Sequence, residues 1–138
     1  MTPPPTAHHI AVPGGEAYIW QLPHGVVVQK AKGVLSIALA QCFGDFYQPI
    51  LTPGASVRIF DDFELLHHYT RDAREYLTEL TLERLYAIES IHFLLSSKFM
   101  ALGVGAFKHA IGDEFVRVYF ERESFVRSYE RALGRLGP

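Results

Sequence analysis

Short apolar runs and longer amphipathic stripes alternate along the chain, and this alternation predicts its secondary structure. Runs rich in β-branched and aromatic residues are typical of strands, whereas apolar residues that recur every three or four positions predict helices. The predicted strands are 17–21, 26–30, 57–60, 90–96 and 115–120, and the predicted helices are 35–48, 71–87, 97–112 and 122–136. Because strands separated by helices usually pair in parallel, we expect a single α/β domain with a mixed, mostly parallel sheet of about five strands and about four helices.

The first two predicted strands form a hairpin, because Pro23 and Gly25 lie between them and suit a tight turn. His24 is then a solvated turn residue rather than a ligand. Residues 1–15 contain consecutive prolines and little to bury, so we expect a mobile Pro-rich N-terminal segment, in which residues 10–12 can form a short edge strand. The folded domain is expected to span residues 16–138.

The stretch 56–74 leads from a predicted strand into a predicted helix. Asp61 and Asp62 are expected to end the strand as a solvated acidic cluster with Glu64, and residues 63–66 to turn the chain. The residues expected in the core are Val57, Ile59, Leu77, Leu94, Leu102 and Phe125. Self-association is a further hypothesis, because the first helix is rich in aromatic residues, namely Phe43, Phe46 and Tyr47.

Composition narrows the functional classes. The formal net charge of -2 over 138 residues argues against nucleic acid as a partner, because phosphate binding needs a concentrated basic face. The single cysteine, Cys42, has no partner for an internal disulfide and suits a reducing compartment. No apolar run has the length of a transmembrane segment, and the start of the chain lacks a signal-peptide pattern. We therefore expect a soluble, cytoplasmic protein.

Three segments give the chain a resemblance to a known fold. They are HGVV at 24–27 followed by Lys32 and Gly33, YTRDAR at 69–74, and SKFMALGV at 97–104. With the order of the predicted elements, they resemble the STAS domain, the sulfate-transporter and anti-sigma-factor antagonist fold, and more closely its SpoIIAA-like group of stand-alone proteins. The resemblance covers about residues 17–136 and implies a STAS-like α/β fold and a bacterial regulatory module that binds a protein partner.

In STAS antagonists, a short motif after the third strand carries a serine that a partner kinase phosphorylates. In this chain the motif falls on Tyr69, Thr70, Arg71 and Asp72. Thr70 retains a hydroxyl at the first serine position, and Arg71 stands at the usual phosphoacceptor position. The resemblance therefore makes Thr70 the candidate phosphoacceptor of this sequence.

Parallel sheets bind ligands beyond the carboxyl ends of their strands, so we expect the candidate site at that edge. Helix N-termini and cations would meet there and favour an anion or an acidic partner. The residues expected to bind the partner or anion are Lys32, Tyr69, Thr70, Arg71, Ser97 and Lys98. The alternative interpretation is that the hydroxyl side chains only cap helices while the cations point into water.

Other polar clusters suggest no further chemistry. His67 and His68 are adjacent on an extended segment and point to opposite sides, and His92 suits a strand residue with a backbone partner, so no metal site is expected. The Gly103 and Gly105 pair suits close packing rather than a dinucleotide fingerprint. No nucleophile, base and orienting group stand together in the pattern, so we expect neither a catalytic site nor a cofactor.

Two functions follow from these features. The first is a non-enzymatic regulatory module that binds a protein partner at the carboxyl edge of the sheet. The second is a small-ligand or lipid-binding domain, since SpoIIAA-like proteins also resemble lipid-carrier folds. A large apolar cavity would favour the second function, and a filled core with an exposed apolar and basic patch would favour the first.

Overall fold

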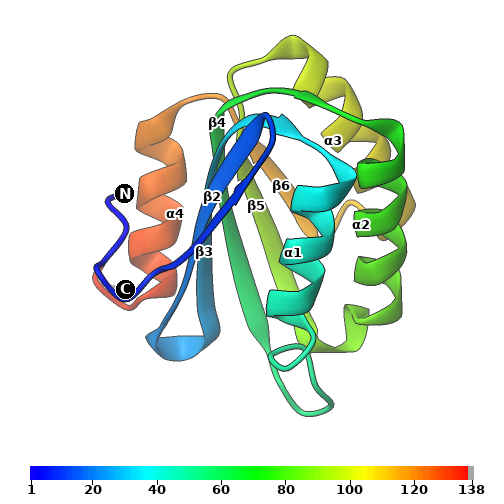
Figure 1. The fold of residues 1–138 in the computed structure, drawn as a ribbon. Helices are drawn as coiled ribbons and strands as arrows, with labels where there is room; N and C mark the ends of the chain where they lie inside the picture. The colour runs from blue at the N-terminus through cyan, green and yellow to red at the C-terminus, as the bar shows by residue number, and fades with distance from the viewer. Residues whose placement is uncertain (137–138) are drawn as a thin grey trace.

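The computed structural model describes residues 1–136 and shows one sheet with helices on both faces (Figure 1). The strands are β1 (His8–Val12), β2 (Gly15–Leu22), β3 (Val26–Leu35), β4 (Val57–Tyr69), β5 (Ile88–Leu94) and β6 (Val116–Tyr119). The helices are α1 (Ile37–Tyr47), α2 (Arg71–Glu83), α3 (Lys98–Ile111) and α4 (Arg122–Ala132). The expected α/β fold with a mixed sheet is confirmed, with six strands in the sheet instead of about five.

The strands lie side by side in the sheet in the same order as in the sequence, β1-β2-β3-β4-β5-β6. The first three strands pair antiparallel, and β3 to β6 pair in parallel. Helices α1, α2 and α3 lie on one face, and α4 covers the other face (Figure 1). The parallel half is thus buried on both faces, which is why its strands read as almost continuous apolar runs.

The beginning of the chain contributes the edge strand. Residues 10–12 were the expected edge segment, and the strand observed begins two residues earlier, at His8. The hairpin between β2 and β3 is also confirmed. It turns at His24 and Gly25, which have φ angles of 65° and 70°, a conformation in which glycine is unstrained.

Strand β4 is longer than predicted, and the expected end at Asp61 and Asp62 is wrong. The strand continues to Tyr69, and the two carboxylates are only 4% and 2% exposed. Successive strand residues point to opposite faces, so Asp61 faces the layer of α1 to α3 and Asp62 faces α4. Both faces are covered by helices, and the acids are therefore buried rather than solvated.

The sheet separates two apolar cores. The larger core lies under α1 to α3 and includes Val57 and Ile59, and the smaller one lies under α4 and includes Leu94 and Phe125, all as predicted. Leu77 is only partly buried against the larger core. The prediction for Leu102 is wrong, because this side chain is 72% exposed.

Leu102 is exposed because a different side of helix α3 packs against the sheet. Met100, Gly103, Val104 and Phe107 are the residues that turn inward. Phe43 and Tyr47 of α1 are likewise buried core residues, 1% and 5% exposed, and Phe46 is partly buried. Self-association through the first helix stays a prediction.

Gly103 permits the close approach of α3 to the end of β4. A Cβ atom at this position would lie 2.4 Å from Cε1 of the Tyr69 ring, so we expect Gly103→Ala to lower the free energy of unfolding by about 1–3 kcal/mol. Gly105→Ala is the control on the same helix, because its Cβ meets no atom within 4 Å and should stabilise by up to about 1 kcal/mol. Urea denaturation measures both, and equal effects would contradict the close approach.

Candidate functional site

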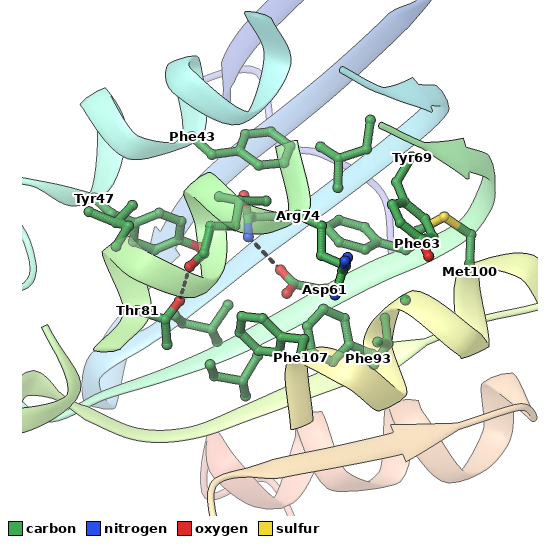
Figure 2. A pocket seen from close by; sticks show the side chains of 18 of the residues that line it. Phe43, Tyr47, Asp61, Phe63, Tyr69, Arg74, Thr81, Phe93, Met100 and Phe107 are labelled. Atoms are coloured by element: carbon green, nitrogen blue, oxygen red, sulfur yellow. Dashed lines mark hydrogen bonds between the residues drawn. The ribbon is translucent and has the colours of Figure 1, made fainter. Parts of the chain in front are cut away.

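A cavity of about 100 Å³ lies between the sheet and helices α1, α2 and α3 (Figure 2). Strands β3, β4 and β5 form its floor, and the three helices form its walls. Most of its lining is aliphatic or aromatic: Leu35, Phe43, Leu51, Ile59, Phe63, Leu77, Leu80, Ile88, Ile91, Phe93, Met100, Val104 and Phe107. Small-molecule sites are typically concave and mostly apolar with a few convergent polar groups, so this cavity is a candidate site.

Two polar residues stand in the floor of this cavity. Gln29 of β3 and Asp61 of β4 are register partners, and each is 4% exposed. The side-chain amide nitrogen of Gln29 donates a hydrogen bond to Oδ1 of Asp61. The amide is oriented by this bond, and its carbonyl oxygen Oε1 is left buried without a hydrogen-bond partner.

Two further polar atoms at the cavity lack partners. The hydroxyl of Tyr47, at the end of α1, and Nε of Arg74, in the first turns of α2, are both buried and lack a well-formed hydrogen bond. The Gln29 side chain lies near enough to the Tyr47 hydroxyl for a weak hydrogen bond to lower the pKa of that hydroxyl. Within residues 1–136, the only buried side-chain nitrogen or oxygen atoms without a partner are these two and Oε1 of Gln29. All three belong to residues that line the same cavity. Buried polar atoms are nearly always hydrogen-bonded, so their concentration here indicates a place where a partner binds.

Burial controls the charge of the cavity. It raises the pKa of Asp61 to about 8, against a small opposing effect of the hydrogen bond from Gln29. Burial also raises the pKa of Tyr47 well above its usual value, the nearby Asp61 raises it further, and a hydrogen bond with the Gln29 side chain slightly opposes the shift. Both groups are therefore mainly protonated at neutral pH, and the floor of the cavity is polar but uncharged.

The buried hydroxyl of Tyr47 gives a direct test of this geometry. We expect Tyr47→Phe to change the free energy of unfolding of the ligand-free protein by less than about 1 kcal/mol, because the buried hydroxyl has only a weak hydrogen bond, to Gln29, to offset the cost of its burial. Deleting a buried hydroxyl that has a good hydrogen bond usually lowers the free energy of unfolding. Chemical denaturation of the two proteins at pH 6.5 measures the difference, and a clear loss would show that the hydroxyl has a strong partner.

The residues predicted from the sequence lie near the carboxyl ends of the strands, and two of their three cations are held in ion pairs. Lys32 pairs with Glu16 at 3.2 Å, and Arg71 pairs with Glu75 at 2.8 Å along α2. Lys98 is exposed at the first position of α3. A shared binding role for the predicted set stays a prediction.

The hydroxyl residues of that set cap helices. Thr70 accepts a hydrogen bond from the backbone N–H of Ala73 at the start of α2, and Ser97 accepts one from Met100 at the start of α3. Tyr69 differs from them, because it lines the cavity and its ring stacks on Phe99 with the centroids 4.9 Å apart. Tyr69 is thus the one predicted residue that reaches the cavity, and phosphorylation of Thr70 stays a prediction.

The acidic residues of β4 differ from the expected solvated cluster. Arg122 of α4 binds Asp62 with two nitrogens at 3.0 Å and also contacts Glu64 at 2.9 Å. This ion pair lies on the α4 face, opposite to the cavity. The pairing neutralises a carboxylate that is 2% exposed, so Asp62 is a structural residue here.

A second buried network lies on the α4 face. Ser90 Oγ is 2.9 Å from Nε2 of His92, the hydroxyl of Tyr119 is 3.0 Å from Nδ1, and Ser128 of α4 lies 2.8 Å from that hydroxyl. His92 therefore has side-chain partners, not the backbone partner expected. Burial, with Arg117 and Arg58 nearby, lowers the pKa of His92 to about 4. The imidazole is a neutral hydrogen-bonding hub, stacked on Phe60 at 4.2 Å.

Sequence reasoning missed Gln29 and Arg74 and assigned Asp61 to a strand end. The signal for the first was a single polar residue directly after three valines, in a strand that is buried on both faces. Asp61 gave a weaker signal, because the stretch 57–66 contains four charged residues among its apolar ones. Polar side chains inside such a strand must find a partner or line a cavity.

Two kinds of feature are absent from residues 1–136. No three His, Cys, Asp or Glu side chains lie together there as metal ligands would. Among the helices of this part of the chain, none combines the length and the apolar character needed to cross a bilayer.

Comparison with known proteins identifies the fold. No family model matches the chain, and no curated protein matches it. The structure is similar to the crystal structure of an uncharacterised protein of the DUF3478 family from Shewanella loihica PV-4, which has a SpoIIAA-like fold. The TM-score is 0.57 at 12% sequence identity, over 88% of this chain and 94% of the other. The expected SpoIIAA-like, STAS-type fold is therefore confirmed, and at this identity the likeness shows the fold alone.

Proposed function

We propose that this SpoIIAA-like domain binds a small, largely apolar molecule in the cavity between its sheet and helices α1 to α3. The observation that supports the proposal is an apolar cavity on which four polar side chains converge, Gln29, Tyr47, Asp61 and Arg74, with Nε of Arg74 buried without a partner. A buried polar atom without a hydrogen bond costs about 1–3 kcal/mol, and a ligand that supplies one removes this cost.

The lining determines what kind of molecule fits. Aromatic rings of Phe43, Phe63, Phe93 and Phe107 surround the space, so the body of the ligand must be apolar. The cavity of about 100 Å³ is of the order of an engineered cavity that holds benzene, roughly 150 Å³. Because this cavity is the smaller of the two, a single aromatic ring is the largest body it suits, and toluene is the probe that supplies one.

Titration with toluene, followed by amide chemical shifts in NMR, tests the proposal. We expect wild-type protein to bind toluene with shifts confined to residues around the cavity. Leu77→Trp places an indole in the cavity and should weaken binding at least about tenfold, because it occupies the volume that the ligand needs.

The matched control is Leu82→Trp on the same helix, because Leu82 is 48% exposed and does not line the cavity. This variant should bind toluene as the wild type does. Leu80→Phe serves as a second filling variant, since Leu80 also lines the cavity, and is used if Leu77→Trp does not fold. Failure of folded wild-type protein to bind toluene, or equal binding by the filled variants, would refute the proposal.

A second candidate function is the binding of a protein partner at the carboxyl end of the sheet. The observation in its favour is that Phe99 and Leu102 are 42% and 72% exposed beside Lys98. We expect Leu102→Glu to abolish capture of a partner that the wild-type protein retains from cell extract. A partner held equally by both proteins would exclude this surface.

A further inference from the structure

One charged side chain of the cavity, Arg74, is not neutralised by any other residue of the lining. Resting on the ligand-binding function proposed above, we infer that the ligand is a small carboxylate, whose apolar body fills the cavity and whose carboxylate pairs with the guanidinium of Arg74. This inference adds the charge of the ligand and the group that recognises it. It follows from how the four polar side chains of the cavity are engaged.

Three of these side chains satisfy one another. The amide nitrogen of Gln29 donates a hydrogen bond to Oδ1 of Asp61, and the Gln29 side chain is also hydrogen-bonded weakly to the hydroxyl of Tyr47. Burial raises the pKa of Asp61 to about 8, so this carboxyl is mainly protonated at neutral pH. Its proton and the Tyr47 hydroxyl are both donors beside Oε1 of Gln29. The cluster of Gln29, Tyr47 and Asp61 is therefore neutral and needs no group from a ligand.

Arg74 has no such partner. Its Nε is buried without a hydrogen bond, and none of the ion pairs formed within residues 1–136 includes its guanidinium. Arg71, three residues earlier on the same helix, does pair with an acid, Glu75, at 2.8 Å. A guanidinium keeps its proton in proteins, so Arg74 carries a positive charge that no acidic side chain offsets.

The cavity as a whole thus favours an anion. Asp61 and Arg74 are the only acidic and basic side chains in its lining, and the first is neutral while the second is charged. A neutral Asp61 does not repel a carboxylate, whereas an ammonium group would meet the positive charge of Arg74. The attraction is strong for its kind, because Arg74 is partly buried beside apolar walls that screen charges less than water does.

The geometry of a guanidinium selects a carboxylate among anions. Two carboxylate oxygens accept in parallel from two nitrogens of one guanidinium, and such charged hydrogen bonds are roughly twice as strong as neutral ones. The phenylalanine rings that line the same space supply the contact for an apolar body. A compact carboxylate with a single ring combines both features.

Three probes that share one ring test the charge of the head group. Toluene has no head group, benzamide has a planar neutral one, and benzoate has a carboxylate of nearly the same shape, which is ionised at pH 6.5. The ratio of benzoate affinity to benzamide affinity therefore reports the preference for an anion. Calorimetric or NMR titrations at pH 6.5 give this ratio for the wild type and two variants.

The first variant is Arg74→Met, which removes the guanidinium and keeps a long apolar side chain. We expect the wild type to prefer benzoate to benzamide, and Arg74→Met to lower the affinity ratio by about tenfold or more, the effect of losing a charged hydrogen bond. Arg127→Met is the control, because it removes the same charge from an exposed site on α4, across the sheet from the cavity (Figure 1). It should leave the ratio unchanged.

A measurement on the wild type alone covers the case in which Arg74→Met does not fold. The Nε–H proton of Arg74 is shielded from water, so its NMR resonance can be followed during a titration. We expect benzoate to shift this resonance more than benzamide does, and toluene to shift it least.

The outcomes separate the inference from the function on which it rests. Equal binding of benzoate and benzamide by the wild type, an unchanged ratio in Arg74→Met, or benzoate binding that Leu77→Trp leaves intact would overturn the carboxylate inference. Toluene binding that Leu77→Trp abolishes would in that case still support ligand binding in the cavity. Absence of binding by all three probes would overturn both proposals.

Discussion

Asp61→Asn is expected to raise the free energy of unfolding at pH 7 by on the order of 4 kcal/mol, since it removes a buried group that resists ionisation. The pKa of Asp61 is about 8 in the folded protein and 3.8 in the unfolded chain. Between these values the unfolded chain has released a proton that the folded protein still holds. The unfolded state is therefore favoured progressively as pH rises, by about 1.4 kcal/mol per pH unit.

His92 acts in the opposite direction over part of this range. Its pKa is about 4 when folded and 6.5 when unfolded, so the stability it contributes is lost as pH falls from 6.5 to 4. Below pH 6.5 the effects of Asp61 and His92 on the free energy of unfolding have opposite signs and offset each other. Above pH 6.5 the effect of Asp61 dominates. The wild-type protein should thus lose about 1 kcal/mol between pH 6.5 and 8, and Asp61→Asn should not.

Urea denaturation at pH 5, 6.5 and 8 measures both profiles. Asp113→Asn is the control, because Asp113 is an exposed acid whose replacement should leave the wild-type profile unchanged. A wild-type protein equally stable at pH 6.5 and 8 would show that Asp61 is already ionised in the native state. The floor of the cavity would then be charged, contrary to the uncharged state described above.

Arg122→Met is expected to lower the free energy of unfolding by about 3 kcal/mol, because it leaves the carboxylate of Asp62 buried without its counterion. Both oxygens of Asp62 accept from the guanidinium at 3.0 Å, and this carboxylate is 2% exposed. The loss of stability comes from leaving the Asp62 carboxylate buried without an opposite charge, and not from the net contribution of the ion pair to stability. Asp62→Asn combined with Arg122→Met should therefore recover much of the loss.

The matched control on α4 is Arg127→Met. Arg127 also pairs with an acid, Glu123, but both side chains are largely exposed, 60% and 84%, so its removal should cost at most about 0.5 kcal/mol. Thermal or chemical denaturation compares the wild type with Arg122→Met, Arg127→Met and the double variant. Similar losses for Arg122→Met and Arg127→Met would mean that burial of Asp62 does not control the effect, and the double variant would then show no recovery.

The sequence alone determined the class of fold and most of its elements. The periodicity of apolar residues places the boundaries of α1 and α3 within about two residues, because Ser36 and Ser97 cap their first turns and Gly112 ends α3. The hairpin at His24 and Gly25 follows from local turn chemistry in the same way. These features depend on residues close in the chain, and a pattern can therefore reveal them.

The tertiary structure alone decided how far β4 extends and where the candidate site lies. A pair of acids ends a strand that faces water, but β4 is covered on both faces, so Asp61 and Asp62 continue it with opposite partners, Gln29 and Arg122. Those partners are 32 and 60 residues away in the chain. The cavity has the same origin, because its unpartnered atoms come from β3, α1 and α2 and meet only when the layers pack. A sequence pattern records local periodicity, whereas the burial of a polar group depends on which distant element covers it.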